Sequence, residues 1–241
     1  MPFDFDRFKT YDINYDLLFD ELMRKVVLSD TNMQKIYLQE WFSKLQEADY
    51  ILKAQMQSPE SIIRCKLEMQ KELENFQVPI YFDNNIVYIH FRISYLNKLC
   101  KINELESEPI SIEEFIGNKQ SIYWSPRSTD IENYAGFTEP IIIVPFLQNQ
   151  HNQLVIDGNH RLTYAEKHKH TSVPTWCISA NSLVNTKCFS SGFDMLLYMF
   201  YNEVAIFSSL TVTKKMSINE IIQLSHLFHP DIHLDELFSI I

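Results

Sequence analysis

The sequence Val155-Ile-Asp-Gly-Asn-His-Arg-Leu-Thr-Tyr-Ala165 decides the fold that we expect for the middle of this 241-residue chain. The apolar residues before Asp157 form a short run typical of a buried strand, and Gly158 permits a tight turn directly after it. A helix is expected to begin by His160 and to continue to about residue 169. The stretch therefore predicts a strand, a turn and a helix in immediate succession.

A helix that starts directly after a buried strand can bind an anion at its first turn. Its first backbone N–H groups have no partner within the helix, and the helix dipole is positive at this end. His160 and Arg161 lie in this turn, where the Arg161 guanidinium can hold a phosphate through two hydrogen bonds. Asp157 can bind Mg²⁺ or accept a proton. The alternative is structural: Asp157 and Asn159 cap the helix, and Arg161 pairs with a surface acid.

Apolar runs on both sides of this stretch predict further strands. Residues 141–145 read Ile-Ile-Ile-Val-Pro, which is typical of a strand buried on both faces, and residues 173–178 predict another. Residues 109–115 predict a short strand followed by a turn or helix start, and residues 128–134 a short helix. Arg127 follows a turn at Ser125-Pro126, so it can complete a phosphate clamp or remain a surface residue beside a packed Trp124.

The two ends of the chain are expected to be mainly helical. Residues 12–28 and 31–51 have apolar side chains at helical spacing, and Thr31 to Gln34 resembles a capping box. Ser58-Pro-Glu60 predicts another helix start, with a buried stripe at Ile62, Met69, Leu73 and Phe76. A hairpin is expected over residues 78–93, and helices over 193–210 and 217–228. The Met and Phe stripe in 193–210 belongs either in the core or at a subunit interface, which leaves a homodimer open.

Composition and charge argue against several classes of protein. The chain has a net charge of −10, and its longest basic runs are pairs such as Lys214-Lys215, so nucleic acid is not an expected partner. Its longest apolar runs are shorter than the roughly 20 residues of a membrane span, and its start lacks the pattern of a signal peptide. We therefore expect a cytoplasmic protein with reduced cysteines, and a buried, inert Cys177 within its strand.

Three segments together resemble the ParB/sulfiredoxin-like superfamily. They are Pro-Ile-Ile-Ile-Val at 140–144, Leu-Val-Ile-Asp-Gly-Asn-His-Arg-Leu-Thr-Tyr-Ala at 154–165 and Val-Pro-Thr-Trp at 173–176. Order and spacing both agree, and the resemblance covers about residues 108–179. It implies a mixed-sheet domain in which the Gly-x-x-Arg turn binds nucleotide phosphates. The phosphate-binding residues would then be Gly158, Asn159, His160 and Arg161, with Arg127 as a further candidate.

Departures from the superfamily pattern reduce the number of superfamily activities that can be expected of this chain. Sulfiredoxins have a cysteine where this chain has Asn159, so thiol-based sulfinic acid reduction is excluded at this turn. Chromosome-partition members continue into a basic helix-turn-helix region, whereas the segment that follows here is acidic and rich in aromatic residues. The motif is closest to ParB-like serine kinases, which use a carboxylate near the first strand. Of Glu108, Glu113 and Glu114 in that region, we take Glu113 as the candidate catalytic residue beside Asp157.

The sequence thus predicts an α+β protein with a ParB/sulfiredoxin-like mixed-sheet domain between helical segments. The expected divisions are a helical region over residues 1–100 that ends in a hairpin, the sheet domain over 101–180 and a helical region over 181–241. The expected function is a nucleotide-dependent phosphotransferase or NTPase that uses ATP, ADP or CTP with Mg²⁺ bound at Asp157 and acts on a small-molecule or protein acceptor. A non-catalytic, nucleotide-gated interaction module and a ParB-like nuclease remain alternatives.

Overall fold

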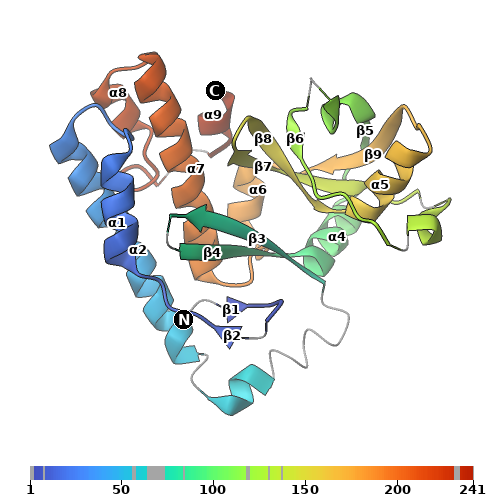
Figure 1. Cartoon of the computed structure of the whole chain (residues 1–241), viewed down its shortest axis with the longest axis horizontal. Coiled ribbons are helices and arrows are strands. Elements are labelled where there is room, and N and C mark those ends of the chain that lie inside the picture. The colour runs from blue at the N-terminus through green and yellow to red at the C-terminus, as the bar shows by residue number, and fades with distance from the viewer. Residues whose placement is uncertain are drawn as a thin grey trace. The chain divides into compact units, whose positions relative to one another are not determined.

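The chain forms helices and a mixed β-sheet, which confirms the α+β class (Figure 1). The computed structural model describes residues 3–7, 9–55, 58–63, 74–83, 85–117, 120–129, 131–136, 138–230 and 234–240. Two compact units make up the chain: unit 1 comprises Met1–Arg92 and Phe189–Ile241, and unit 2 comprises Ile93–Cys188. The terminal regions expected as separate segments therefore belong to one unit, and unit 2 is inserted between them in sequence.

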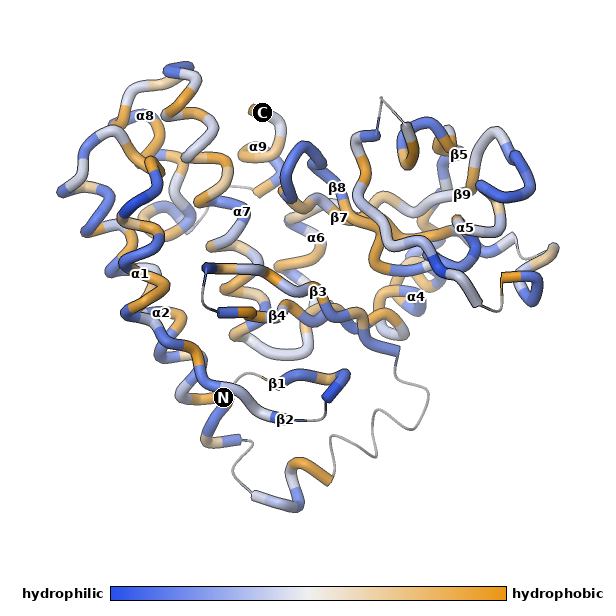
Figure 2. The backbone as a smooth tube through the Cα atoms, in the orientation of Figure 1, coloured by the Kyte–Doolittle hydropathy of each residue, from blue (hydrophilic) through white to orange (hydrophobic). Residues whose placement is uncertain are grey.

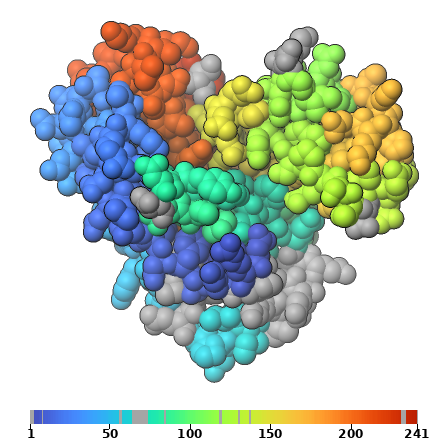
Figure 3. Space-filling view, in the orientation of Figure 1, coloured from blue at the N-terminus to red at the C-terminus, as the bar shows by residue number. Residues whose placement is uncertain are grey.

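Unit 1 combines helices with two short antiparallel sheets. Its sheets pair β1 with β2 and β3 with β4, and the second is the hairpin expected over residues 78–93. The elements are β1 (Phe3–Asp4), β2 (Lys9–Thr10), α1 (Tyr15–Arg24), α2 (Thr31–Gln55), β3 (Asn75–Phe82), β4 (Asn85–Arg92), α7 (Gly192–Thr213), α8 (Ile218–Gln223) and α9 (Leu234–Ser239). Figure 3 shows the N-terminal residues, in dark blue, against the β3–β4 hairpin, in teal.

Helix α7 is the core helix of unit 1, and its aromatic residues pack against α2. The ring centroids of Trp41 and Phe200 lie 5.8 Å apart, and those of Tyr37 and Phe207 lie 5.5 Å apart. Among the described helices, α7 alone is long and apolar enough to cross a membrane by length and composition (Figure 2). Half of that apolar stretch is buried inside the fold, and Glu203 within it is hydrogen-bonded to α2, as is typical of a core helix.

Two expected details at the helix starts of unit 1 are corrected. No capping box forms at the start of α2: Asp30 accepts the backbone N–H of Met33, and the buried Gln34 side chain instead accepts the N–H of Val27 and donates to the carbonyl of Leu22 in α1. Asp30 acts there because its short carboxylate reaches the first free N–H groups. Ser58 does cap a helical turn, as predicted, by accepting the N–H of Ser61. Of the stripe expected beyond it, Met69 and Leu73 lie outside the described residues, and Phe76 belongs to β3.

Unit 2 is built on a five-stranded mixed sheet in the order β5-β9-β7-β8-β6. β7 pairs antiparallel with β8 and parallel with β9, so the expected strands over 141–145, 154–156 and 173–178 share one sheet. The unit also has a helix that was not predicted, α4, whose Ile93, Leu96 and Cys100 are buried at helical spacing. The elements are α4 (Ile93–Ile102), β5 (Glu108–Ser111), η1 (Ile112–Glu114), β6 (Ile122–Tyr123), η3 (Ile131–Tyr134), β7 (Ile141–Gln148), β8 (His151–Asp157), α5 (Asn159–Lys167), β9 (Ser172–Cys177) and α6 (Ala180–Asn185).

The core of unit 2 forms where α5 and η1 cover the same sheet face. Leu162 and Ala165 from α5 join Ile143 and Val155 from the two central strands in one buried cluster, which Phe115 closes. Alternate residues of a strand point to opposite faces, so this register places the motif helix directly against the sheet.

The expectation for Cys177 was wrong in one respect. The residue is exposed at the last position of β9, whereas the preceding Trp176 is buried. Partial burial still raises the pKa of its thiol, with a further contribution from Glu108, so the thiol form persists at neutral pH. Cys100 and Cys188 are buried, as expected of small hydrophobic residues, and Cys65 lies outside the described residues.

Candidate functional site

Gly158 makes the sharp turn between β8 and α5. Its φ is +91°, a left-handed conformation that glycine adopts without strain. A Cβ atom at this position would lie 2.3 Å from Cγ2 of Ile141, so the neighbouring strand leaves no room for a side chain. Gly158 is also the N-cap of α5, and no side chain caps this helix start. The predicted strand, turn and helix are confirmed, with the helix beginning at Asn159.

Asp157 and Arg161 form a largely buried ion pair across this turn. Nη2 of Arg161 lies 2.9 Å from Oδ2 of Asp157, and the two side chains are only 12% and 11% exposed. Nη1 of Arg161 donates to the backbone carbonyls of Glu139 and Pro140, at 2.9 and 3.1 Å. The guanidinium therefore ties the turn to the start of β7. Arg161 thus pairs closely with its own motif partner Asp157, and its Nη1 also lies 4.0 Å from Oε2 of the exposed Glu139, a longer contact with a surface acid.

Helix α4 supports the same turn from a second direction. Nδ2 of Asn97 donates to Oδ2 of Asp157 at 3.0 Å, and one helical turn later Lys101 pairs with Glu139 at 2.9 Å. The hydrogen bond and charge of Lys101 lower the pKa of the Glu139 carboxyl group, to which Arg161 adds a smaller contribution. Every hydrogen bond that Asp157 accepts from the described side chains goes to Oδ2. Its Oδ1 is therefore the atom that a metal ion or a proton could bind.

The side chain of Asn159 has a structural role. It is buried, and its Oδ1 accepts the backbone N–H of Ser125 at 2.9 Å. Thr163, one turn further along α5, accepts the backbone N–H of Arg127 at 3.0 Å. These two bonds hold residues 125–127 along the helix, with the Arg127 side chain exposed. Neither Asp157 nor Asn159 caps the helix as the structural alternative required, and the Oδ1 atom of Asn159 is committed to Ser125.

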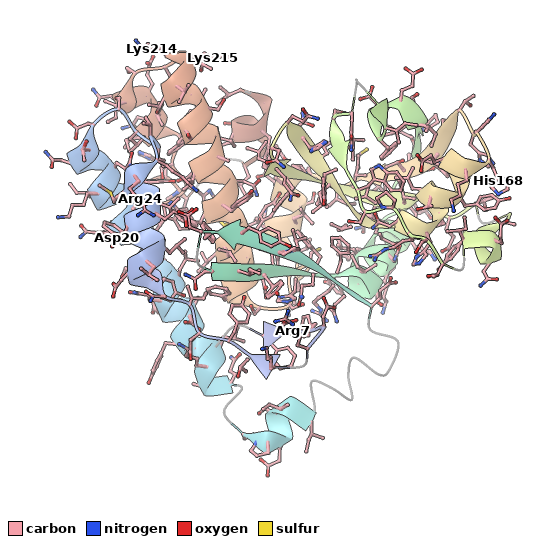
Figure 4. All side chains as sticks on the ribbon, in the orientation of Figure 1. Arg7, Asp20, Arg24, His168, Lys214 and Lys215 are labelled. Carbon is pink, nitrogen blue, oxygen red and sulfur yellow. The ribbon has the colours of Figure 1, made fainter. Side chains whose placement is uncertain are left out.

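His160 faces an aromatic surface beside the helix. Its ring stacks on Tyr134 of η3, with centroids 5.2 Å apart and planes inclined by 8°. On the next turn, Tyr164 stacks on His168, whose position at the end of α5 is labelled in Figure 4. A pocket of about 290 Å³ adjoins this surface. Its lining includes Tyr134, Glu139, Arg161, Tyr164, His170 and Val173.

Glu113 lies in a different environment from Asp157. It is an exposed residue of η1, where its backbone N–H donates to Oγ of Ser111. Glu113 lies just after the edge strand β5, whereas Asp157 ends β8, with β9 and β7 between these strands in the sheet, so the structure does not bring the two expected catalytic carboxylates together.

Mg²⁺ would have one protein carboxylate at this turn. Within the described part of the chain, no group of three or more His, Cys, Asp or Glu side chains is arranged to hold a metal ion. Mg²⁺ commonly binds through one or two carboxylates together with water and substrate phosphates. Asp157 therefore fits a magnesium ion that arrives with a phosphate ligand and does not fit a permanent metal centre.

Sequence reasoning missed Asn97, Tyr134 and Glu139 as parts of this site. The spacing of Ile93, Leu96 and Cys100 is helical and could have predicted α4, which carries Asn97. The contribution of the other two comes from contacts between segments distant in sequence, for which no local pattern exists.

Comparisons of the chain with protein-family models, with curated proteins and with solved structures found no match. The α+β class and the geometry of the site therefore rest on the structure itself.

Proposed function

We propose that unit 2 is a ParB/sulfiredoxin-like nucleotide-binding domain that acts as a nucleotide-dependent phosphotransferase or NTPase. Phosphate would bind at the backbone N–H groups of the first turn of α5, and the aromatic pocket beside it would accept the rest of the nucleotide. The observation that carries the proposal is the uncapped start of α5 at Gly158, directly after a central strand. The nearby polar side chains that could have capped it, Asp157 and Asn159, bond elsewhere.

The chemistry assigned to each side chain follows from its contacts. Asp157 would use Oδ1 to hold Mg²⁺ or to take a proton from an acceptor hydroxyl. Arg161 would fix the turn and add positive charge beside the phosphate, and direct contact with the phosphate would require it to leave a backbone carbonyl. His160 would contribute a ring nitrogen at the helix start. ATP, ADP and CTP remain the nucleotides proposed, with a small-molecule or protein acceptor in a cytoplasmic setting.

A non-catalytic, nucleotide-gated binding module is the second candidate. It is favoured by the Asp157–Arg161 ion pair, because the carboxylate that catalysis would need is already engaged by a guanidinium and by the Asn97 amide. In this case nucleotide binding would change the contacts of the turn without turnover.

The decisive experiment places a negative charge at the helix start. His160→Glu favours the helix, because an acid in the first turn suits the helix dipole, but it repels phosphate. The affinity for ATP, ADP, CTP or GTP with Mg²⁺, measured by thermal shift and calorimetry, should fall at least about tenfold, as expected for loss of a charge-assisted interaction. His168→Glu at the opposite end of α5 is the matched control and should leave the affinity unchanged.

Asp157→Asn then distinguishes the two candidates. An enzyme should lose turnover with this variant while its magnesium-independent nucleotide binding is retained. The binding module has no turnover to lose and should bind phosphate equally well or better. If the wild-type protein binds none of the four nucleotides, the proposed function is wrong.

A further inference from the structure

A second polar network lies in unit 1, around His90 of β4. His90 and Asp194 of α7 are both 3% exposed, and Nδ1 of His90 lies 2.6 Å from Oδ1 of Asp194. The other ring nitrogen, Nε2, lies 2.9 Å from Oε1 of Gln77, the cross-strand neighbour of His90 on β3. An oxygen atom thus lies within hydrogen-bond distance of each ring nitrogen of His90. The other hydrogen bonds of these oxygens determine which ring nitrogens must carry a proton.

The Gln77 amide has one orientation that satisfies all its neighbours. Oε1 accepts the backbone N–H of Phe5 at 2.8 Å, and Nε2 donates to Asp4 and Asp6 at 3.2 Å each. Reversing the amide would place its NH₂ group against an N–H donor and its oxygen against two carboxylates. Because Oε1 is an acceptor, Nε2 of His90 must carry a proton.

The opposite side of the ring requires a second proton. Oδ1 of Asp194 also accepts the backbone N–H of His90 at 3.0 Å, and Oδ2 accepts the hydroxyl of Ser191, which itself accepts the backbone N–H of Asp194. A proton must therefore lie between Nδ1 of His90 and the carboxylate. Whichever of the two atoms holds it, the His90–Asp194 pair binds one proton more than a neutral histidine beside a carboxylate.

We propose that this pair is a proton-dependent latch for the N-terminal turn, residues 4–7. Loss of the extra proton leaves one N–H on the ring, and the short bond to Asp194 retains it. Nε2 then presents a lone pair to Oε1 of Gln77, two acceptors 2.9 Å apart. The amide can relieve this repulsion only by turning, which breaks its bonds to Phe5, Asp4 and Asp6. The latch is therefore closed at lower pH and opens as the pH rises.

Contacts with Gln77 and His90 hold the N-terminal turn in position. The Phe5 ring packs edge-on against His90, with centroids 4.3 Å apart, and Asp4 accepts the N–H groups of Asp6 and Arg7. Figure 4 labels Arg7 in this turn, below the hairpin.

Other titratable groups also face the His90–Asp194 pair, but none of them takes over the role of the proton that the pair holds. From the N-terminal turn these are Asp4, Asp6 and Arg7, and from the adjoining segments Tyr11 and Tyr88. Burial raises the pKa of both tyrosines, so they stay protonated across the range in which the latch would open.

The first test is NMR of the wild-type chain labelled with ¹⁵N-histidine. At pH 6 Nε2 of His90 should carry a proton while Nδ1 shares one with Asp194, and a bare Nε2 at this pH would overturn the inference. The second measurement is the hydrogen-exchange protection factor of the Phe5 amide, which corrects for the intrinsic effect of pH on exchange. It should fall at least about tenfold between pH 6 and pH 9, as loss of a charge-assisted hydrogen-bond network implies.

Two variants and an internal reference complete the test. Gln77→Met removes the amide that links His90 to the turn, so Phe5 should exchange rapidly at both pH values. His168→Gln alters a histidine of unit 2 and should keep the wild-type response. Amides of α7 should stay protected at pH 9. A parallel loss of their protection would show that the whole unit loosens, and persistence of the pH response in Gln77→Met would show that Gln77 does not transmit it; either result would refute the latch.

Discussion

Gly158 is the residue on which the geometry of the candidate site depends most directly. Two separate constraints act on it: a φ of +91°, and a neighbouring Ile141 that leaves no space for a Cβ atom. Gly136 provides a comparison, because its φ of +80° is similar but nothing lies within 4 Å of a Cβ built there. Comparing Gly158 with Gly136 therefore separates the free-energy cost of the backbone conformation from the cost of the close approach of Ile141.

We predict that Gly158→Ala lowers the free energy of unfolding by about 2–4 kcal/mol, since backbone strain and overpacking each cost roughly 1–3 kcal/mol. Gly136→Ala should cost about 1 kcal/mol, because it introduces only the backbone strain. Urea unfolding followed by circular dichroism measures both values. Equal losses in the two variants would mean that the approach of Ile141 is not a constraint.

At the scale of elements, α4 connects the turn to the rest of unit 2 through two contacts of different quality. Asn97 bonds a carboxylate that is 11% exposed, whereas Lys101 and Glu139 are 56% and 55% exposed. The degree of burial sets the energetic contribution of each contact, because water screens an exposed ion pair more strongly than a partly buried hydrogen bond to a carboxylate.

Asn97→Ala should therefore lower the stability of unit 2 by about 1–2 kcal/mol, because it removes a hydrogen bond to a charged group. Lys101→Ala on the same helix should cost less than about 0.5 kcal/mol, as is typical of exposed pairs. Thermal unfolding of the two variants side by side gives the comparison. A larger effect of Lys101→Ala would contradict the ranking by burial.

At the scale of the whole molecule, each unit contains the partners that its core requires. In unit 1, Glu203 is fully buried in α7 and accepts hydrogen bonds from Tyr37, Trp41 and Ser225, which belong to α2 and to the turn after α8. Desolvation is the largest influence and raises the pKa of its carboxyl group, against the lowering effect of these donors. One residue thus makes the stability of unit 1 depend on pH.

The sign of this dependence follows from proton linkage. A carboxyl group with a raised pKa binds its proton more tightly in the folded chain, so stability falls as the pH rises from the ordinary glutamate value through the folded pKa. Each tenfold gain in proton affinity on folding costs about 1.4 kcal/mol of stability at neutral pH. We predict that Glu203→Gln makes the stability between pH 4 and pH 8 less dependent on pH, as measured by urea unfolding.

Glu220 is the control for this measurement. Its pKa is lowered by the capping hydrogen bonds with Ser217, so its contribution to stability has the opposite sign and is lost as the pH falls. If Glu203→Gln leaves the pH dependence of the wild type unchanged, Glu203 is not its source.

The division into units makes a further prediction. Ile93–Cys188 is continuous in sequence and contains a complete five-stranded sheet with its own buried cluster. A fragment of residues 93–188 should fold by itself, with cooperative thermal unfolding and dispersed amide resonances. A fragment of residues 1–92 should not, because α2 would lack α7, which covers its aromatic residues.

The local structure of the motif could be predicted from the sequence because its signals are local. Apolar runs of strand length predicted β7, β8 and β9, and Gly158 marked the turn, since each depends on side-chain type and short spacing. The start of the helix after Ser58 was predictable for the same reason. The helix α4 also had a helical pattern, but its first residues continue a β-rich run, and the strand signal obscured it.

The roles of the site residues were decided by the tertiary structure. Sequence alone determined that Asp157, Asn159 and Arg161 lie together at a strand-to-helix turn. Only the fold decided that Arg161 reaches the backbone at Glu139, that Asn159 is committed to Ser125, and that two strands separate β5, before Glu113, from β8, which ends at Asp157. The physical reason is that a polar side chain bonds whatever group burial brings within reach, and segments distant in sequence supply that group.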